Sequence, residues 1–115
     1  MVVIDNFHII FVDVDDTLIF DYNQTLNPDD GVIIEHAGGT EMVVPHKKHI
    51  NLIKSLHAQG YAIIVMSQGG WDWARAVVEG LELTSYITAV MTKPEKYIDD
   101  MDVKSWLKER IYLEP

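Results

Sequence analysis

The chain has no cysteine, which excludes disulfides, zinc–thiolate sites and cysteine-based phosphatase chemistry together. Basic residues are also few, and the formal net charge is -9. Because binding to a nucleic-acid backbone requires clustered Lys and Arg, we do not expect nucleic acid to be the main partner. No apolar run approaches the ~20 residues needed to span a bilayer, and the first five residues lack the basic region of a signal peptide. We therefore expect a soluble cytoplasmic protein with no membrane partner.

The length of 115 residues leaves room for one domain that can bury a core of its own. Neither an internal repeat nor a low-complexity tract interrupts the chain, and the one loop-rich stretch lies at residues 21–31. The sequence therefore predicts a single domain over residues 1–115.

Several apolar runs rich in β-branched residues predict strands that are covered on both faces, as in a parallel sheet. They lie at residues 9–12, 61–66, 86–91 and 97–98, and residues 111–113 are a candidate for a short edge strand.

Helices are predicted between and after these runs. Pro45 suits the first position of a helix that Gly60 stops. A second helix is predicted over residues 70–79, and a third runs from a cap at Asp102 through Arg110.

A β-hairpin is predicted before the first helix, because residues 32–34 and 42–44 are apolar and flank Gly38 and Gly39. The alternation of strands and helices otherwise implies right-handed crossovers and a parallel sheet. The predicted fold class is therefore α/β, a three-layer Rossmann-like, doubly wound parallel sheet of about five strands with a hairpin flap.

The first apolar run ends in two carboxylates, Asp13 and Asp15, which are separated by one residue. Ligands of open α/β sheets bind at the carboxyl ends of the strands, where Asp13 is expected to lie. Two carboxylates this close need a bound cation or a shared proton. A purely structural interpretation is also open, since Asp15, Asp16 and Thr17 are typical turn and cap residues.

The ends of the other runs also carry polar residues. They are Ser67, Gln68 and Gly69 after the second run, Lys93 after the third, and Asp99 and Asp100 after the fourth. A hydroxyl and backbone N–H groups at a helix start suit an anion, a lysine adds a point cation, and acidic residues can complete a metal site.

Taken in order, these strand ends resemble the four motifs of the haloacid dehalogenase superfamily of phosphohydrolases. In this sequence the motifs read Asp13-Val14-Asp15-Asp16-Thr17-Leu18, Ser67, Lys93 and Asp99-Asp100. The resemblance covers residues 7–113, nearly the whole chain. The short spacing from Lys93 to Asp99 is similar to that of small stand-alone members from phages and bacteria.

The resemblance implies a role for each motif residue. Asp13 would attack phosphorus to give an aspartyl phosphate, which water then cleaves. Asp15 would protonate the leaving oxygen and later deprotonate that water. Ser67 and Lys93 would hold the phosphoryl oxygens, with Gln68 and Gly69 beside them as phosphate-binding residues. The implied activity is that of a phosphatase, a phosphoric monoester hydrolase.

The resemblance also implies Mg²⁺ as the cofactor, held by the Asp13 carboxylate, the Asp15 main-chain carbonyl and one of Asp99 and Asp100. Neighbouring residues of an extended chain point to opposite faces, so only one of that pair is expected to touch the ion, and Asp99 is favoured. Asp102 is expected to be a helix cap.

Other functions fit the same residues less well. A receiver domain needs an acceptor Asp near the middle of the chain, but there is no Asp between Asp30 and Asp72. Dehalogenation needs no acid to protonate a leaving oxygen, so Asp15 favours phosphate esters. A non-catalytic interaction module that binds magnesium and phosphate remains the alternative.

The gaps between motifs are too short for the cap domain that reads the leaving group in larger relatives. We therefore expect an open site, with a phosphorylated small molecule or a phosphorylated macromolecule as partner. Helical spacing places Trp71 with Ala74 and Val78 in the core and Trp73 at the rim of the site. His46 and His49, three residues apart, are not expected to bind a metal. The sequence leaves the natural substrate and the oligomeric state open.

Overall fold

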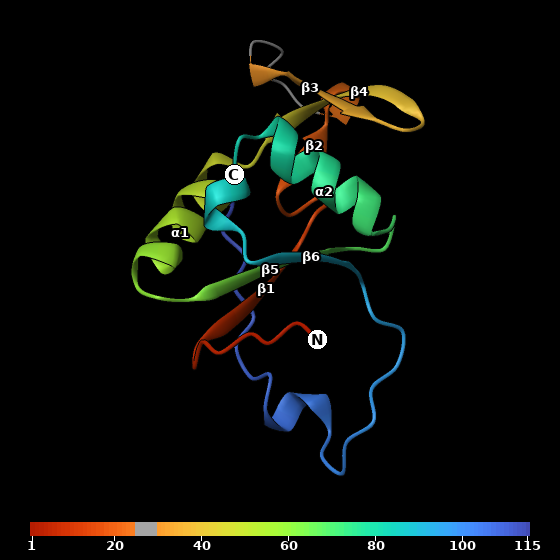
Figure 1. Ribbon diagram of the computed structural model, residues 1–115. Coiled ribbons are helices and arrows are strands. Elements are labelled where there is room, and N and C mark those ends of the chain that lie inside the picture. The colour runs from red at the N-terminus through yellow and green to blue at the C-terminus, as the bar shows by residue number, and fades with distance from the viewer. Residues whose placement is uncertain (25–29) are drawn as a thin grey trace.

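The computed structural model describes residues 1–24 and 30–115 and is a mixed α/β structure with two small sheets. Residues 25–29, part of the expected loop-rich stretch, lie outside the described residues. In Figure 1 the two helices, α1 (Lys47–Ala58) and α2 (Trp71–Gly80), lie on one side of the parallel sheet. The start of the chain and a turn of the C-terminal segment lie on the other side.

The parallel sheet contains β1 (Ile9–Asp13), β5 (Ala62–Ser67) and β6 (Ala89–Thr92) in the order β1-β5-β6. Its central strand is almost wholly buried, as the uninterrupted apolar run predicted. The prediction of about five parallel strands is wrong for the described residues, because three are present and one edge of β1 is unpaired. Since all three strands are parallel, their carboxyl ends meet at one edge of the sheet.

The second sheet is antiparallel and contains β2 (Ile19–Asp21), β4 (Gly39–Pro45) and β3 (Val32–His36), in that order. The predicted hairpin is confirmed, and Gly39 has a φ of 125°, which only glycine adopts readily. Strand β2 was not predicted; it pairs with β4 and returns the chain from the first acidic motif to the hairpin. A 3₁₀ turn, η1 (Tyr22–Gln24), follows it.

Helices α1 and α2 were both predicted, with one error at a boundary. Pro45 does not start α1 but ends β4, where it pairs with Ile19. The cap is His46, whose Nδ1 atom accepts a hydrogen bond from the backbone N–H of His49. At the other end, Gly60 has a φ of 92° and stops the helix as expected.

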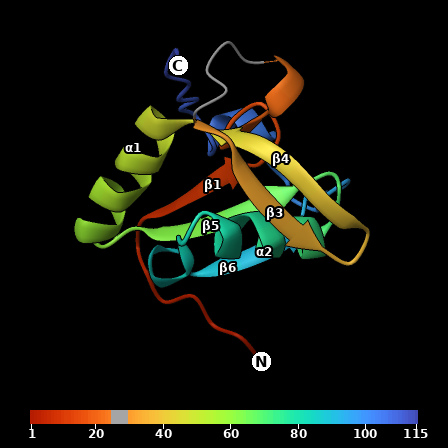
Figure 2. The same cartoon turned by 90° about the horizontal axis from the view of Figure 1, so that it is seen from above.

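Helix α2 lies between the two sheets, packed against β3 on one side and β5 and β6 on the other. In the view from above in Figure 2, β3 crosses over α2. A Cβ at Gly80 would collide with Cδ1 of the buried Ile34 side chain, so a larger residue there would require that side chain to shift. The largest fully buried apolar side chains join both sheets in one core; they are Val14, Leu18, Ile34, Ile63, Val65, Val77 and Leu83.

The C-terminal predictions are wrong. Residues 93–115, all of them described, contain neither a strand at 97–98 or 111–113 nor an α-helix over 102–110. One 3₁₀ turn, η4 (Val103–Ser105), is capped by Asp102, whose Oδ1 accepts from the N–H of Lys104. Trp106 and Leu107, which were predicted to lie in this helix, remain nearly half exposed. Without such burial a short helix is only marginally stable.

Before β6 the chain makes a further 3₁₀ turn, η3 (Thr84–Tyr86). None of the helices among the described residues has the length and apolar character required to cross a membrane.

Candidate active site

Three of the predicted motif residues meet at the carboxyl edge of the parallel sheet. Asp13 is the last residue of β1, Ser67 is the last of β5, and Lys93 directly follows β6. The Nζ atom of Lys93 lies 3.8 Å from Oδ1 of Asp13, and its backbone N–H donates to the Ser67 carbonyl at 2.9 Å. Acid, hydroxyl and lysine are therefore brought together by strand pairing alone.

The loop between β5 and α2 is held by hydroxyl groups. Ser67 is 1 % exposed, and its Oγ accepts from the N–H of Gly69 at 3.0 Å. Thr92 Oγ1 accepts from the N–H of Trp71 at 3.0 Å. The predicted anion site at this helix start is thus partly occupied by the protein's own oxygens. Because Ser67 Oγ accepts one bond, its hydroxyl hydrogen is left to donate elsewhere.

Thr92 was not predicted as a site residue, although a hydroxyl at the end of the third apolar run is a visible signal. Gln68, which was expected to contact phosphate, is exposed on the same loop as Gly69.

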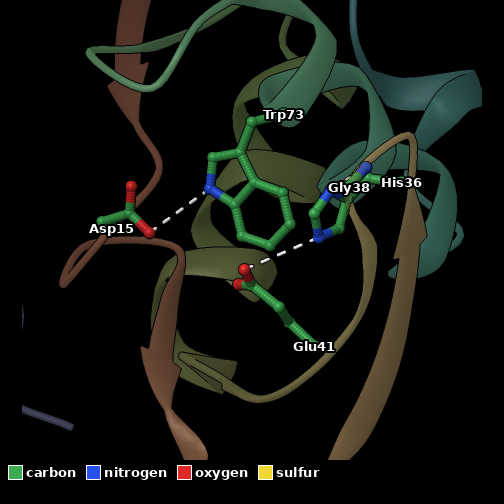
Figure 3. A network of polar contacts seen from close by, with 5 residues as sticks. All are labelled: Asp15, His36, Gly38, Glu41 and Trp73. Carbon is green, nitrogen blue, oxygen red and sulfur yellow. Dashed lines mark hydrogen bonds and ion pairs between the residues drawn. The ribbon is translucent and has the colours of Figure 1, made fainter.

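Asp15 lies in a tight turn just beyond β1. The carbonyl of Val14 accepts hydrogen bonds from the N–H groups of Thr17, Leu18 and Ile19. Asp16 adopts a φ of 62°, in the left-handed region that Asp and Asn enter more easily than other side chains. This turn places the Asp15 carboxylate beside α2, where the indole N–H of Trp73 donates to its Oδ1 at 3.3 Å (Figure 3).

The surroundings of Asp15 favour its protonated form. Loss of water contact raises the pKa of this carboxyl above its usual value, and the negative charges of Asp13, Asp16 and Glu41 raise it further. The hydrogen bond from Trp73 opposes these effects by stabilising the carboxylate. A carboxyl group with a raised pKa is what a general acid requires.

The two acids predicted as further metal ligands are not brought to this edge. Asp99 and Asp100 are exposed in the C-terminal segment, and Asp99 Oδ1 accepts a local hydrogen bond from the N–H of Met101 at 3.0 Å. Within residues 1–24 and 30–115, no three His, Asp or Glu side chains are placed to hold a metal ion. The residues as placed therefore do not fit the magnesium site that the resemblance implies.

The hairpin of β3 and β4 forms the far wall of a cleft next to Asp15, which we call the flap cleft. It has a volume of about 560 Å³ and lies between the hairpin and α2. Trp71 and Trp73 both line it. The prediction that Trp71 lies in the core is wrong, because its side chain is 54 % exposed. Trp73 was predicted at the rim of the site, and it lies beside Asp15 in the cleft lining while also packing against the core.

A pair of buried histidines holds the end of the chain next to the Asp15 turn. The rings of His46 and His49 stack with centroids 3.7 Å apart and are 1 % and 5 % exposed. His46 Nε2 donates to the carbonyl of Leu113 at 2.7 Å, and the Leu113 N–H donates to His49 Nε2 at 2.8 Å. His49 Nδ1 in turn donates to the carbonyl of Thr17 at 2.6 Å.

The tyrosine before Leu113 contacts the same turn, since the Tyr112 hydroxyl donates to the Asp16 carbonyl at 3.3 Å. We call His46, His49, Tyr112 and Leu113 the tail clasp. The sequence offered no signal for it, because the two histidines lie more than 60 positions from the residues that they contact in the C-terminal segment.

No family model matches the chain, and no curated protein or solved structure does so either. The function must therefore be argued from the geometry of the strand tips and the clefts beside them.

Proposed function

We propose that the protein is a phosphomonoester hydrolase that acts through an aspartyl phosphate on Asp13. The observation that carries this proposal is the meeting of Asp13, Ser67 and Lys93 at adjacent strand tips. A carboxyl group with a raised pKa, Asp15, lies on the turn directly beyond them. A nucleophile, two groups for the phosphoryl oxygens and an acid are the parts that this chemistry requires.

The first step transfers the phosphoryl group to the protein. An Asp13 carboxylate oxygen attacks phosphorus, and the bond from phosphorus to the leaving oxygen breaks. The protonated Asp15 carboxyl gives its proton to that oxygen, so the leaving group departs as a neutral alcohol. The Lys93 ammonium and the Ser67 hydroxyl stabilise the negative charge on the three equatorial oxygens.

The second step restores the protein. A water molecule attacks phosphorus of the aspartyl phosphate, and the Asp15 carboxylate accepts its proton. The bond from phosphorus to the Asp13 oxygen breaks, which releases inorganic phosphate and leaves Asp15 protonated for the next cycle. Magnesium, which the resemblance implies, would supply further charge neutralisation at the phosphoryl group when bound.

The alternative is a non-catalytic module that binds a phosphorylated partner on the same strand tips. The observation that favours it is the position of Asp99 and Asp100, which leaves the site short of the ligands that the phosphatases of the family use.

The two functions are separated by hydrolysis of p-nitrophenyl phosphate, measured with and without Mg²⁺. Asp13→Asn should lower kcat by at least ~10³-fold, because an amide cannot form the covalent intermediate. The control is Asp5→Asn, which makes the same change at an exposed residue of the N-terminal segment and should not alter kcat. Wild-type turnover in Asp13→Asn would disprove the aspartyl-phosphate mechanism, and absence of any turnover in the wild type would favour the binding module.

A further inference from the structure

The outer edge of β1 is not paired with another strand. The N–H of Ala62, in β5, donates to the carbonyl of His8, and the backbone groups of successive strand residues face alternate edges. The N–H and carbonyl groups of Ile9 and Phe11 therefore point away from β5. Among residues 1–24 and 30–115, these groups form no hydrogen bond outside the sheet. A free edge of this kind can accept a further strand.

A groove follows this free edge, and we call it the edge groove. Every residue from Phe7 to Asp13 lines it, and its volume is about 940 Å³. An extended stretch of that length spans about 20 Å, which is longer than a small ligand requires. Helix α1 and residues 104–112 also line the groove, and Figure 1 shows α1 and the turn of the C-terminal segment on opposite sides of the parallel sheet. This elongated shape suits an extended peptide.

Large apolar side chains are exposed along the edge groove. Those that line it and are at least 39 % exposed are Phe7, Ile9, Phe11, Trp106, Leu107 and Ile111. Exposed apolar surface gathered in one place marks a site that another molecule covers. Because β1 contributes to this surface, a partner that buries it also lies beside the unpaired backbone groups of the strand.

The edge groove is basic, although the chain as a whole is acidic. It is lined by four of the nine Lys and Arg residues but by only two of the eighteen Asp and Glu residues. Lys93 lies 3.8 Å from Asp13. The other three basic residues, Lys104, Lys108 and Arg110, form no ion pair with any described residue. Their charges complement carboxylates on a partner.

From the free edge, the apolar lining and the charge we infer that the edge groove binds an extended, acidic segment of another protein, which adds to β1 as a fourth strand of this sheet. The backbone of the segment pairs with Ile9 and Phe11. Its carboxylates face Lys104, Lys108 and Arg110. The inference does not depend on the proposed hydrolysis.

Two other occupants fit the groove less well. A second copy of this chain, related by a two-fold axis, would place the same basic residues opposite each other, which like-charge repulsion disfavours. A single-stranded nucleic acid can stack on Phe7 and Trp106 and contact the lysines, but it cannot pair with the backbone of β1. Of the three, only an acidic peptide uses the edge, the apolar lining and the charge together.

The first test measures the binding of fluorescein-labelled octapeptides by fluorescence polarisation at physiological salt. A peptide of four Val-Glu repeats should bind at least ~10-fold more tightly than one of four Val-Lys repeats, because only the first complements the charge of the groove. A peptide of four Pro-Glu repeats keeps the charge but cannot pair as a strand, and it should also bind at least ~10-fold more weakly. Equal affinity for the Val-Glu peptide and either of the others, or no saturable binding of the Val-Glu peptide, would overturn the inference.

Two double variants that remove the same charge locate the binding site. Lys104→Gln with Lys108→Gln should weaken binding of the Val-Glu peptide at least ~5-fold. Lys48→Gln with Lys96→Gln changes two exposed lysines outside the groove lining and should alter the affinity less than ~2-fold. Equal weakening in the two variants would mean that the peptide responds to total charge and not to the groove, which contradicts the inference.

Hydrogen exchange of backbone N–H groups tests whether the peptide adds as a strand. The N–H groups of Ile9 and Phe11 should become protected only when the Val-Glu peptide is bound, whereas that of Ile10, which faces β5, should be protected in both states. Protection of Ile9 and Phe11 in the protein alone would show that a second copy or another segment of this chain already covers the edge. Tighter binding of an octathymidylate, with these two groups left unprotected, would make nucleic acid the partner. Either result would overturn the inference.

Discussion

The strand-tip region and the C-terminal segment of this chain are stabilised in different ways. In residues 9–92, apolar runs form strands, the strands pair, and a common core contains side chains from both sheets. In residues 93–115, large apolar side chains such as Ile98 and Trp106 remain exposed, and backbone structure is limited to one 3₁₀ turn. Burial stabilises the first region, whereas a few directional hydrogen bonds at the tail clasp hold the end of the second.

This difference shows that the position of a motif residue depends on the strand that carries it more than on the motif itself. Asp13 and Lys93 lie together because β1 and β6 flank the same central strand. Asp99 belongs to the same series of motifs, but no strand carries it, and it bonds only within its own turn.

The largest difference between the two regions should appear when one leucine is truncated in each. Leu83→Ala should lower the free energy of unfolding by about 2–5 kcal/mol, because Leu83 is 0 % exposed and its removal leaves a cavity. Leu107→Ala should cost less than ~1 kcal/mol, since that side chain is 47 % exposed. Urea unfolding checks both values. Similar losses would show that residues 93–115 are packed as tightly as the core.

The tail clasp should contribute more to the free energy of unfolding than any exposed contact of the C-terminal segment. His49→Ala removes the acceptor for the Leu113 N–H and the donor to the Thr17 carbonyl, both largely buried. We expect a loss of about 1–3 kcal/mol in urea unfolding. His57→Ala, on the same helix but exposed, is the matched control and should cost less than half as much. Equal losses would mean that the clasp does not hold the tail.

A smaller effect of opposite sign is expected at Asp15. A carboxyl whose pKa is raised by folding destabilises the native state once it ionises, so its contribution to stability is full below the unfolded pKa and is lost as pH rises through the folded pKa. Asp15→Asn should therefore raise Tm slightly at pH 7, by less than about 2 °C because this side chain is exposed to solvent. The gain should fade as pH falls through ~4 and be absent below pH ~3, where Asp15 is protonated in both states. A gain that does not depend on pH would contradict this cause.

The smallest expected difference lies within the C-terminal segment. Magnesium titrations followed by Tm should respond equally in Asp99→Ala and Asp102→Ala, because neither side chain reaches the strand tips and each makes only a local hydrogen bond. The family resemblance implies the opposite result. If Asp99→Ala alone loses the magnesium response, the segment around residue 99 joins the site when the ion binds, and the contrast between the two regions is smaller than the structure indicates.

Much of the candidate site could be predicted because its residues follow directly from strands that are buried on both faces. An uninterrupted apolar run fixes where such a strand ends, and parallel pairing brings the ends together. Asp13, Ser67 and Lys93 were located in this way, and the hairpin was found from Gly38 and Gly39 between two apolar runs.

The sequence by itself thus determined the strand ends, the hairpin and the two helices, because periodicity and turn residues act over a few positions. Only the tertiary structure decided which indole reaches Asp15, that His46 and His49 hold the C-terminal segment, and that residues 97–113 form neither a strand nor an α-helix. The physical reason is the same in each case. Each outcome depends on whether a segment distant in sequence covers the residue or provides a hydrogen-bond partner, and a local sequence pattern does not say whether such a segment is present.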